Sequence, residues 1–190
     1  MKYIKQFELT KFYDEKDIFK YIYEIDSPKI KELISKIPNI NLNIKTSNGD
    51  TPLIITIRYG LYQIFKILID SGADVNTTDN FGNTPLILVV RNKKEEMIQD
   101  LITAGADINK INNNSETALI VNSNYNYRDK KALKITKFLI ENGADWNITD
   151  DIDHTFIDYL PPAYRKEIIE EYPEEYSNYL MVKNTNKFNI

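Results

Sequence analysis

Residues 51–76 read TPLIITIRYGLYQIFKILIDSGADVN, and this stretch decides the fold. Thr51 can accept a backbone N–H at a helix N-terminus, and Pro52 suits the first helical turn because no donor is needed there. Gly60 can end this short first helix in a left-handed conformation. A second helix follows, whose apolar residues recur at helical spacing before Gly72 closes it. These apolar residues are Ile64, Phe65, Ile67 and Leu68. The stretch therefore predicts a helix–loop–helix unit that leads into an extended turn.

The same pattern recurs downstream at a fixed period. Thr51, Thr84 and Thr117 open successive units at equal intervals along the chain. The motif after the second helix recurs as GADVN at 72–76, GADIN at 105–109 and GADWN at 143–147. The interval between the last two copies is longer than the regular one, so the third unit carries a five-residue insertion. Such a unit cannot bury its apolar face alone, and its neighbours must stack on it.

A period of about 33 residues, with Thr-Pro-Leu opening one helix and GADVN following another, resembles the ankyrin repeat. The clear resemblance covers residues 48 to about 150. It implies an all-α fold, an ankyrin-repeat solenoid of about five helix–loop–helix–turn units with divergent terminal caps. The expected parts are an N-terminal flank (1–13), a divergent N-capping repeat (14–46), two repeats (47–79 and 80–112), a repeat with the insertion (113–150), a C-terminal capping repeat (151–173) and a polar tail (174–190).

The two caps are predicted from weaker copies of the pattern. In the N-terminal cap, Ile18, Phe19, Ile22 and Ile25 mark one helix, and Ile30, Leu33, Ile34 and Ile37 mark the other. In the C-terminal cap, Thr155 takes the place of the motif threonine and Pro161-Pro162 breaks the first helix. Residues 163–172 are predicted to form an amphipathic second helix, and from Glu174 onward a polar, asparagine-rich tail is predicted whose end is expected to fray.

Several positions depart from the family pattern. The histidine that usually follows Thr-Pro-Leu is replaced by Ile54, Ile87 and Ile120, so apolar packing is expected where the family has a hydrogen-bond network. Lys93 stands where a loop glycine is common. Trp146 replaces a small apolar residue and is predicted to pack against the C-terminal cap.

The resemblance implies that a partner binds on the concave face made by turn tips and first helices. The candidate partner-binding residues are Asn48, Asp50, Arg58, Tyr59, Phe81, Asn83, Arg91, Asn92, Asn114, Glu116, Ile152 and His154, with Ser47, Asn80 and Asn113 beside them. Phe81 and Arg91 are the preferred anchors, because aromatic residues and arginine are enriched in interface hot spots. Simpler interpretations stay open: Phe81 packs against the adjacent turn, Arg91 is a solvated helix end, Tyr59 packs on a neighbouring repeat, and His154 is an ordinary turn residue.

Two further features have functional and structural interpretations. The insertion is placed near residues 122–127, between two helices, where Tyr125 and Tyr127 could form a second contact site; a tolerated loop extension is the simpler hypothesis. Asn76, Asn109 and Asn147 resemble asparagines that are hydroxylated in ankyrin repeats, although the structural consensus explains them equally well.

Composition excludes several classes of site. The chain has 190 residues, a net charge of -4, no cysteine and one histidine, which excludes disulfides, thiolate nucleophiles and multi-histidine metal sites. No metal and no cofactor is expected. The acidic balance argues against nucleic acid and against anionic membranes. No signal peptide is recognised near the N-terminus, so the cytoplasm is the expected location. The protein is expected to be a monomer.

Three classes of function can be compared on these residues. The first is a protein–protein interaction module that binds a partner protein not identified by the sequence. The second is an adaptor that recruits a ubiquitin ligase through an F-box-like segment, suggested by Leu160-Pro161-Pro162 and Glu167-Ile168-Ile169. The third is an enzyme, but no phosphate loop, nucleophile elbow or paired metal ligands are present. The sequence therefore predicts a binding protein and no enzyme.

Overall fold

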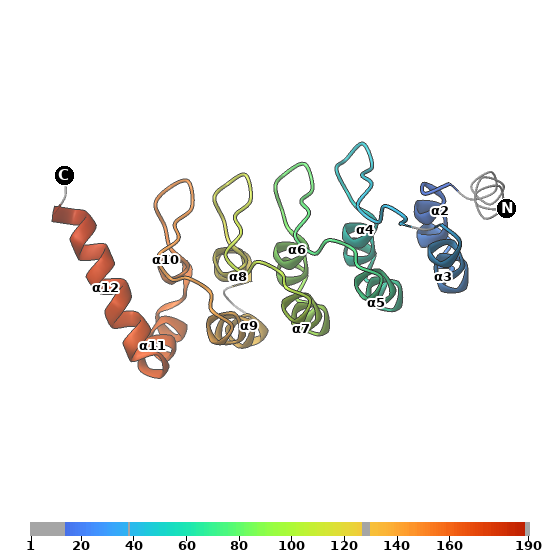
Figure 1. Ribbon diagram of the computed structural model, residues 1–190. Coiled ribbons are helices and arrows are strands. Elements are labelled where there is room, and N and C mark those ends of the chain that lie inside the picture. Colours follow the sequence, from blue (N-terminus) through green and yellow to red (C-terminus); the bar gives the residue numbers. More distant parts are fainter. Residues whose placement is uncertain (1–13, 38, 127–129, 189–190) are drawn as a thin grey trace. The chain divides into compact units, whose positions relative to one another are not determined.

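The computed structural model describes residues 14–37, 39–126 and 130–188 (Figure 1). The helices in these ranges are α2 (Asp17–Tyr23), α3 (Ser27–Lys36), α4 (Pro52–Tyr59), α5 (Tyr62–Asp70), α6 (Pro85–Arg91), α7 (Glu95–Thr103), α8 (Ala118–Asn126), α9 (Lys130–Glu141), α10 (Phe156–Tyr159), α11 (Pro162–Glu171) and α12 (Pro173–Phe188). No strand occurs in these ranges, which confirms the predicted all-α fold. The predicted N-terminal flank, residues 1–13, lies outside the described residues.

The helices group into two compact units, Met1–Leu88 and Val89–Ile190, whose boundary falls within α6. In the first unit α2 packs on α3 and α4, and α5 packs on α3 and α4. In the second unit α8 packs on α9 and α10, and α11 packs on α12. Each unit is therefore built from helix pairs that stack on the next pair, as the repeat predicts.

Hydroxyl groups of the motif threonines start the first helices. The Oγ1 atoms of Thr51, Thr84 and Thr117 accept the backbone N–H three residues on, at 3.3, 3.1 and 3.3 Å. Thr155 forms a capping box with Asp158 at the start of α10. A side-chain oxygen at this position satisfies a backbone donor that the helix leaves without a partner, so the threonines set where each helix begins.

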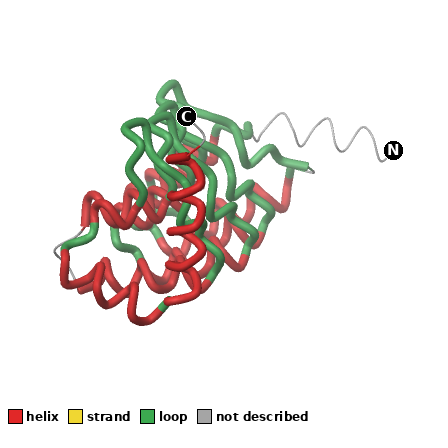
Figure 2. Tube along the Cα trace, turned by 90° about the vertical axis from the view of Figure 1, so that its left-hand side faces the viewer, coloured by secondary structure: helices red, strands yellow, loops and turns green. Residues whose placement is uncertain are grey.

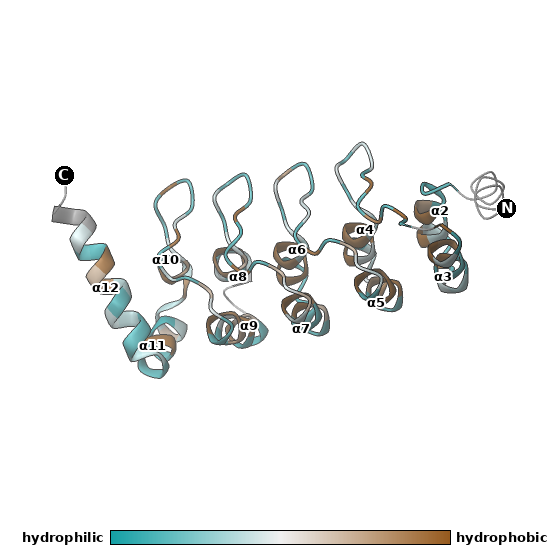
Figure 3. Ribbon diagram, viewed as in Figure 1, coloured by the Kyte–Doolittle hydropathy of each residue, from teal (hydrophilic) through white to brown (hydrophobic). Residues whose placement is uncertain are grey.

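Apolar packing replaces the family's motif histidine, as predicted. Ile54, Ile87 and Ile120 are 0%, 0% and 1% exposed. In α5 the residues Ile64 and Phe65 are buried as well, whereas Ile67 is only half-buried. Figure 3 shows the result, with apolar colour over much of α4 and α6 and mostly hydrophilic or neutral colour on the turns.

The N-terminal cap has the two predicted helices, α2 and α3. Ile18, Ile22, Ile30 and Leu33 are fully buried. Ile25 does not belong to the buried face of α2: it lies beyond the end of the helix, has a left-handed φ of 55° and is 63% exposed. The periodic pattern includes it because spacing alone does not show where a helix ends.

The C-terminal segment is helical where the sequence analysis predicts a polar tail. Residues Pro173–Phe188 form α12, a helix of 16 residues. Pro173 suits the first turn, and Glu174 and Glu175 stabilise the positive end of the helix dipole. Tyr179 is 4% exposed, and its hydroxyl lies 3.4 Å from Thr155 Oγ1. The polar composition of this segment did not indicate that Tyr179 would be buried.

The five-residue insertion also differs from its prediction as a loop. Residues Asn122 to Asn126 lie in α8, and α9 reaches 12 residues where α5 has 9. The Asn122 side chain is 0% exposed, and its Nδ2 donates to Ala132 O and Thr136 Oγ1, each at 2.8 Å. The asparagine-rich segment is helical because α9 supplies these partners. Tyr127 lies outside the described residues.

Lys93 adopts the backbone conformation of the loop glycine that it replaces, with a left-handed φ of 54° two residues after the end of α6, as Gly60 has 69° after α4. The predicted packing of Trp146 is confirmed. Trp146 is 5% exposed, and its ring packs edge-on against Phe156 at 5.0 Å and Tyr172 at 6.4 Å. Among the described residues no helix is long and apolar enough to cross a membrane.

Candidate protein-binding surfaces

One side chain stabilises each turn from within. Asp79, Asn112 and Asp150 occupy the same place, five residues before the motif threonine. The Oδ1 atom of each of these residues accepts two hydrogen bonds, from the backbone N–H groups two and four residues further on. All six distances lie between 2.9 and 3.1 Å. The backbone N–H of the same residue donates to the carbonyl four residues on, at 3.0 to 3.1 Å. The turns are therefore closed by their own hydrogen bonds and form firm supports for the residues at their tips.

The tips project from the helices (Figure 2). They carry exposed side chains. Phe81 is 70% exposed at the tip in the first unit, and Ile152 is 65% exposed at the same register in the second. Asn48 and Asn114 take this register in the other two turns and are exposed too. A bulky apolar side chain that stays in water on a firm support is typical of a binding surface.

Arg58 and Asp50, two predicted site residues, serve the scaffold of the first unit. Arg58 Nη2 donates to Asp50 Oδ1 at 2.9 Å and to Asp79 Oδ2 at 2.8 Å. Asp50 is only 9% exposed. Burial opposes the charge of Arg58, but the two carboxylates outweigh burial and raise its pKa. This bridge joins one turn to the next.

Further contacts between these two turns hold Phe81 in place. Lys45 Nζ donates to Thr78 O at 2.7 Å, and Asn80 Nδ2 donates to Ser47 O at 3.2 Å. A Cβ on Gly49 would lie 2.2 Å from Asn80 Oδ1, so only glycine permits this approach. Because its ring is 70% exposed, Phe81 does not bury itself against the adjacent turn.

Tyr59 lies at the other end of α4 and contacts a residue that the sequence interpretation missed. Tyr59 is 65% exposed, and its ring packs edge-on against Tyr23 at 6.0 Å. Tyr23 is 58% exposed at the end of α2. Its position at the end of a first helix, which matches that of Tyr59, was the signal that could have identified it.

In the second unit Arg91 stacks on an exposed tyrosine. The guanidinium carbon of Arg91 lies 5.2 Å from the ring centre of Tyr125, which is 55% exposed. Asn92, the next predicted residue, is exposed. An arginine over a tyrosine face combines apolar area with hydrogen-bond donors.

Asn83 and Glu116 are internal residues of their turns. Each is 4% exposed. Asn83 Nδ2 donates to Asp79 Oδ2 at 3.2 Å, and Glu116 Oε2 accepts from Asn112 Nδ2 at 2.9 Å. With Asp50, these residues shape the turns from inside and present little to a partner.

The turn before α10 contains the single histidine. His154 is exposed, and its ring lies 5.4 Å from the ring of Tyr159.

Burial and the neighbouring Asp150, which accepts a hydrogen bond from the Tyr159 hydroxyl, raise the pKa of Tyr159 to about 12. Burial opposes ionisation of Asp150, but hydrogen bonds from Tyr159 and from the backbone of His154 and Ile152 lower its pKa below the ordinary 3.8. His154 thus lies in a turn, beside an aromatic ring.

The three motif asparagines have structural partners. Asn109 Oδ1 accepts the backbone N–H of Asp145 at 2.8 Å, and its Nδ2 donates to Gly143 O at 3.2 Å. Asn147 bonds Asp145 within its own turn at 3.0 Å, and Asn76 is half-buried. In the described ranges no group of three or more His, Cys, Asp or Glu side chains could hold a metal ion.

Comparison with known proteins supplies the family. One model, of ankyrin repeats in many copies, matches residues 33–89, and a second, of ankyrin repeats in three copies, matches residues 75–150. A search of curated proteins finds no match. Ankyrin repeats are generally protein–protein interaction modules and are generally not enzymes. The two matches together span more than half of the sequence, and the capped helix pairs recur at the predicted period, so the chain is an ankyrin-repeat protein.

Proposed function

We propose that the protein binds a partner protein through its turn tips, with Phe81 as the main anchor. The observation that carries this proposal is a phenylalanine 70% exposed at the tip of a turn that is closed by its own hydrogen bonds. Burying such a ring contributes about 2 kcal/mol of hydrophobic free energy. A rigid support lowers the entropy lost on binding, so most of that contribution remains.

The predicted site residues divide into two groups on this proposal. The proposed binding residues are Asn48, Tyr59 and Phe81 in the first unit, and Arg91, Asn92, Asn114, Ile152 and His154 in the second. The scaffold residues are Asp50, Arg58, Asn83 and Glu116, because their side chains are bonded within and between the turns. Only the first group is expected to affect binding without affecting the fold.

We further propose that the protein acts as a monomer in the cytoplasm, without binding nucleic acid. The absence of cysteine suits a reducing compartment, and the net charge of -4 opposes binding to phosphate backbones. Size-exclusion chromatography with light scattering tests the oligomeric state.

The adaptor hypothesis receives no support from the C-terminal residues that suggested it. Glu167 and Glu171 pair with Lys137 at 2.7 and 2.6 Å, and Ile168 is 0% exposed. Tyr172 contacts Trp146. These contacts join α11 to Lys137 of α9 and to Trp146, so the segment is sufficiently explained as a cap.

The test of the proposed function is affinity capture from cell extract followed by mass spectrometry. The Phe81→Ala variant should no longer capture the partner. The double variant, Phe81→Ala with Arg91→Ala, should fail to capture it even when the salt concentration of the extract is lowered. Ile25→Ala is the matched control, since Ile25 is 63% exposed in the same unit and lies in the short link between α2 and α3 rather than at a turn tip. Circular dichroism confirms that each variant folds. Equal capture by all variants would remove the turn tips from the proposal.

A further inference from the structure

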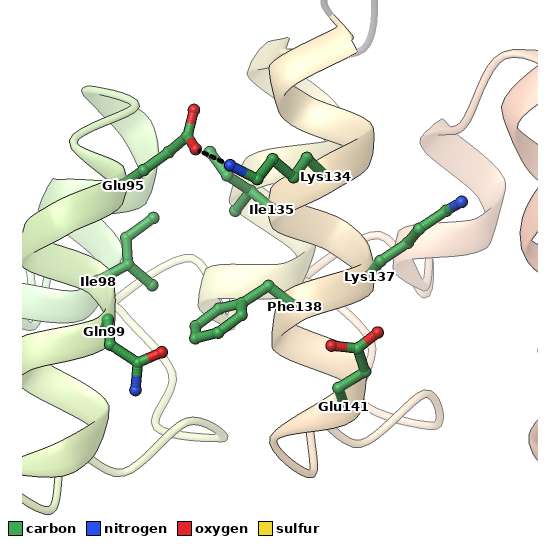
Figure 4. A pocket seen from close by; sticks show the side chains of 8 residues that line it. All are labelled: Glu95, Ile98, Gln99, Lys134, Ile135, Lys137, Phe138 and Glu141. Carbon is green, nitrogen blue, oxygen red and sulfur yellow. Dashed lines mark hydrogen bonds and ion pairs between the residues drawn. The ribbon is translucent and has the colours of Figure 1, made fainter.

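A groove with an apolar floor lies between α7 and α9 in the second unit (Figure 4). Its volume is about 390 Å³, within the usual range of ligand pockets. The half-buried Phe138 of α9 supplies the apolar surface of its floor, and Ile98 of α7 and Ile135 of α9 lie beneath that surface, 1% and 2% exposed. In Figure 4 the Phe138 ring reaches from α9 toward Ile98 and Gln99. The groove can therefore receive an apolar side chain.

One end of this groove is strongly basic. Lys94 precedes Ile98 by one helical turn, and Lys131 precedes Ile135 by one turn, so each lysine shares a helix face with a floor residue. Lys130 lies beside Lys131, and all three lysines are exposed. Both helices begin at this end, and the positive ends of their dipoles add to the lysine charge.

Acidic groups at the same end leave an excess of positive charge. Glu95 is paired with Lys134 across the groove at 2.6 Å, as the dashed line in Figure 4 shows. Glu96 is exposed. Among the described residues at the two helix starts, the lysines are Lys93, Lys94, Lys130, Lys131 and Lys134, and the glutamates are Glu95 and Glu96. This excess stands out on a chain whose net charge is -4.

At the other end of the groove the charged side chains bond to groups within the protein. Lys137 turns away from Ile98 and pairs with Glu167 and Glu171 of α11 (Figure 4). Glu141 accepts a hydrogen bond from the Tyr172 hydroxyl at 3.2 Å. The two ends of the groove therefore differ in charge. Positive charge lies at the end where α7 and α9 begin, and the apolar floor follows it along the groove.

The repeat by itself does not produce this combination. In the first unit a groove of about 530 Å³ between α3 and α5 has one apolar lining residue, Ile67. Its other lining residues are Ser27, Lys31, Gln63, Lys66, Asp70 and Ser71. The residues in register with Lys93 and Lys94 are Gly60 and Leu61, which carry no charge. The groove between α3 and α5 therefore lacks the basic end and the apolar floor of the groove between α7 and α9.

We propose that this groove binds an acidic peptide segment of a partner protein, with an apolar side chain of the segment against Phe138 and its carboxylates at the lysines. The charge excess selects an acidic occupant, and the apolar floor selects a peptide over nucleic acid, whose phosphates carry no apolar group. The inference rests on the proposed role in protein binding but uses a different surface from Phe81.

The test is fluorescence polarisation of the full chain with a labelled synthetic peptide that has one leucine among glutamates. The variant Lys94→Glu with Lys130→Glu should bind this probe at least about tenfold more weakly. Lys36→Glu with Lys166→Glu is the matched control, because it makes the same change in net charge at exposed lysines elsewhere and should bind as the unaltered chain does. A probe with alanine in place of leucine should bind more weakly to every form.

The outcomes separate this inference from the proposed function. Phe81→Ala should bind the probe normally, so loss of partner capture by that variant leaves the groove untouched. The inference is overturned by a probe that does not bind, by equal weakening in the two double variants, or by an alanine probe that binds as tightly as the leucine probe. Tighter binding of a labelled oligonucleotide that displaces the peptide would assign the basic end to nucleic acid and overturn it too.

Discussion

The Thr51 hydroxyl accepts the Ile54 N–H at 3.3 Å and is 1% exposed, so it should contribute measurably to stability. We expect Thr51→Ala to lower the free energy of unfolding by about 1 kcal/mol more than Thr51→Ser does. Both substitutions remove the methyl group, so their difference isolates the hydroxyl. Urea unfolding followed by circular dichroism measures it, and equal values for the two variants would contradict the capping role.

Asp150 should make stability depend on pH. Its pKa is lowered in the folded protein, so its contribution is present above the unfolded pKa and is lost as pH falls through the folded value. Asp150→Asn keeps the oxygen that accepts backbone N–H groups but does not ionise in this range. We expect the unaltered chain to be the more stable at pH 7, by a margin that shrinks below about pH 4.

Urea midpoints of the two proteins between about pH 3 and 7 check this expectation. Other carboxylates, including Asp158 with its lowered pKa, are present in both proteins and cancel in the comparison. A margin that is the same at every pH would show that ionisation of Asp150 adds nothing.

At the scale of the elements, the turns of the first unit depend on close contact. Gly49 and Gly72 have left-handed φ values of 77° and 87°, but a Cβ at Gly49 would meet Asn80 N at 2.7 Å, whereas nothing lies within 4 Å at Gly72. Gly72→Ala should cost about 1 kcal/mol of backbone strain. Gly49→Ala should cost at least about 1 kcal/mol more, because the neighbouring turn must shift.

Urea unfolding of Gly49→Ala and Gly72→Ala measures the two losses in the free energy of unfolding and tests which is larger. If Gly49→Ala is no more destabilising than Gly72→Ala, the two turns do not touch as described, and Phe81 lacks the firm support on which its role as an anchor depends.

The pairing of α8 with α9 depends on a buried amide. Asn122 Nδ2 bonds two groups of α9, so Asn122→Ala removes both bonds and leaves their acceptors buried. We expect a loss of about 2 kcal/mol in the free energy of unfolding. Asn124→Ala, in the same helix and half-buried, should change it by less than about 0.5 kcal/mol. Thermal or urea unfolding distinguishes the two variants, and similar losses would count against the buried amide.

At the scale of the molecule, the chain offers a probe of its C-terminal cap. Trp146 is the single tryptophan, 5% exposed and in contact with Tyr172. A chain ending at Leu160 lacks α11 and α12, so water should reach the indole and shift its fluorescence emission to the red. Lys166→Glu in the full chain is the control, because Lys166 is exposed on α11. Unchanged emission after truncation would mean that the two helices do not cover Trp146.

How far the sequence predicts this protein depends on whether a residue's role is local. Thr84 caps a helix through a group three residues away, and Lys93 turns the chain through its own φ, so spacing was enough for both. Asn122 and Tyr179 find partners 14 and 24 residues away, on Thr136 and Thr155. No local pattern shows such partners, so the sequence predicts a loop and a tail for the segments around them.

The candidate site follows the same division. The residues at the turn tips could be named from the repeat, and the exposure of Phe81 and Ile152 agrees with their place in it. Their neighbours Asp50, Asn83 and Glu116 share the same turns, yet they are buried by bonds that only three-dimensional contact reveals. The groove between α7 and α9 was not predicted, since its lining comes from two repeats at once.

The sequence by itself determined the repeat, its period, the start of each first helix and the apolar replacement of the motif histidines. These properties depend on backbone groups a few residues apart and on which residues can be buried. Only the tertiary structure decided which polar residues are internal, that the last residues of the described chain form α12, and where an apolar groove meets a basic end. Those outcomes depend on contacts between distant segments, and a side chain's partner across such a distance is set by packing rather than by its place in the repeat.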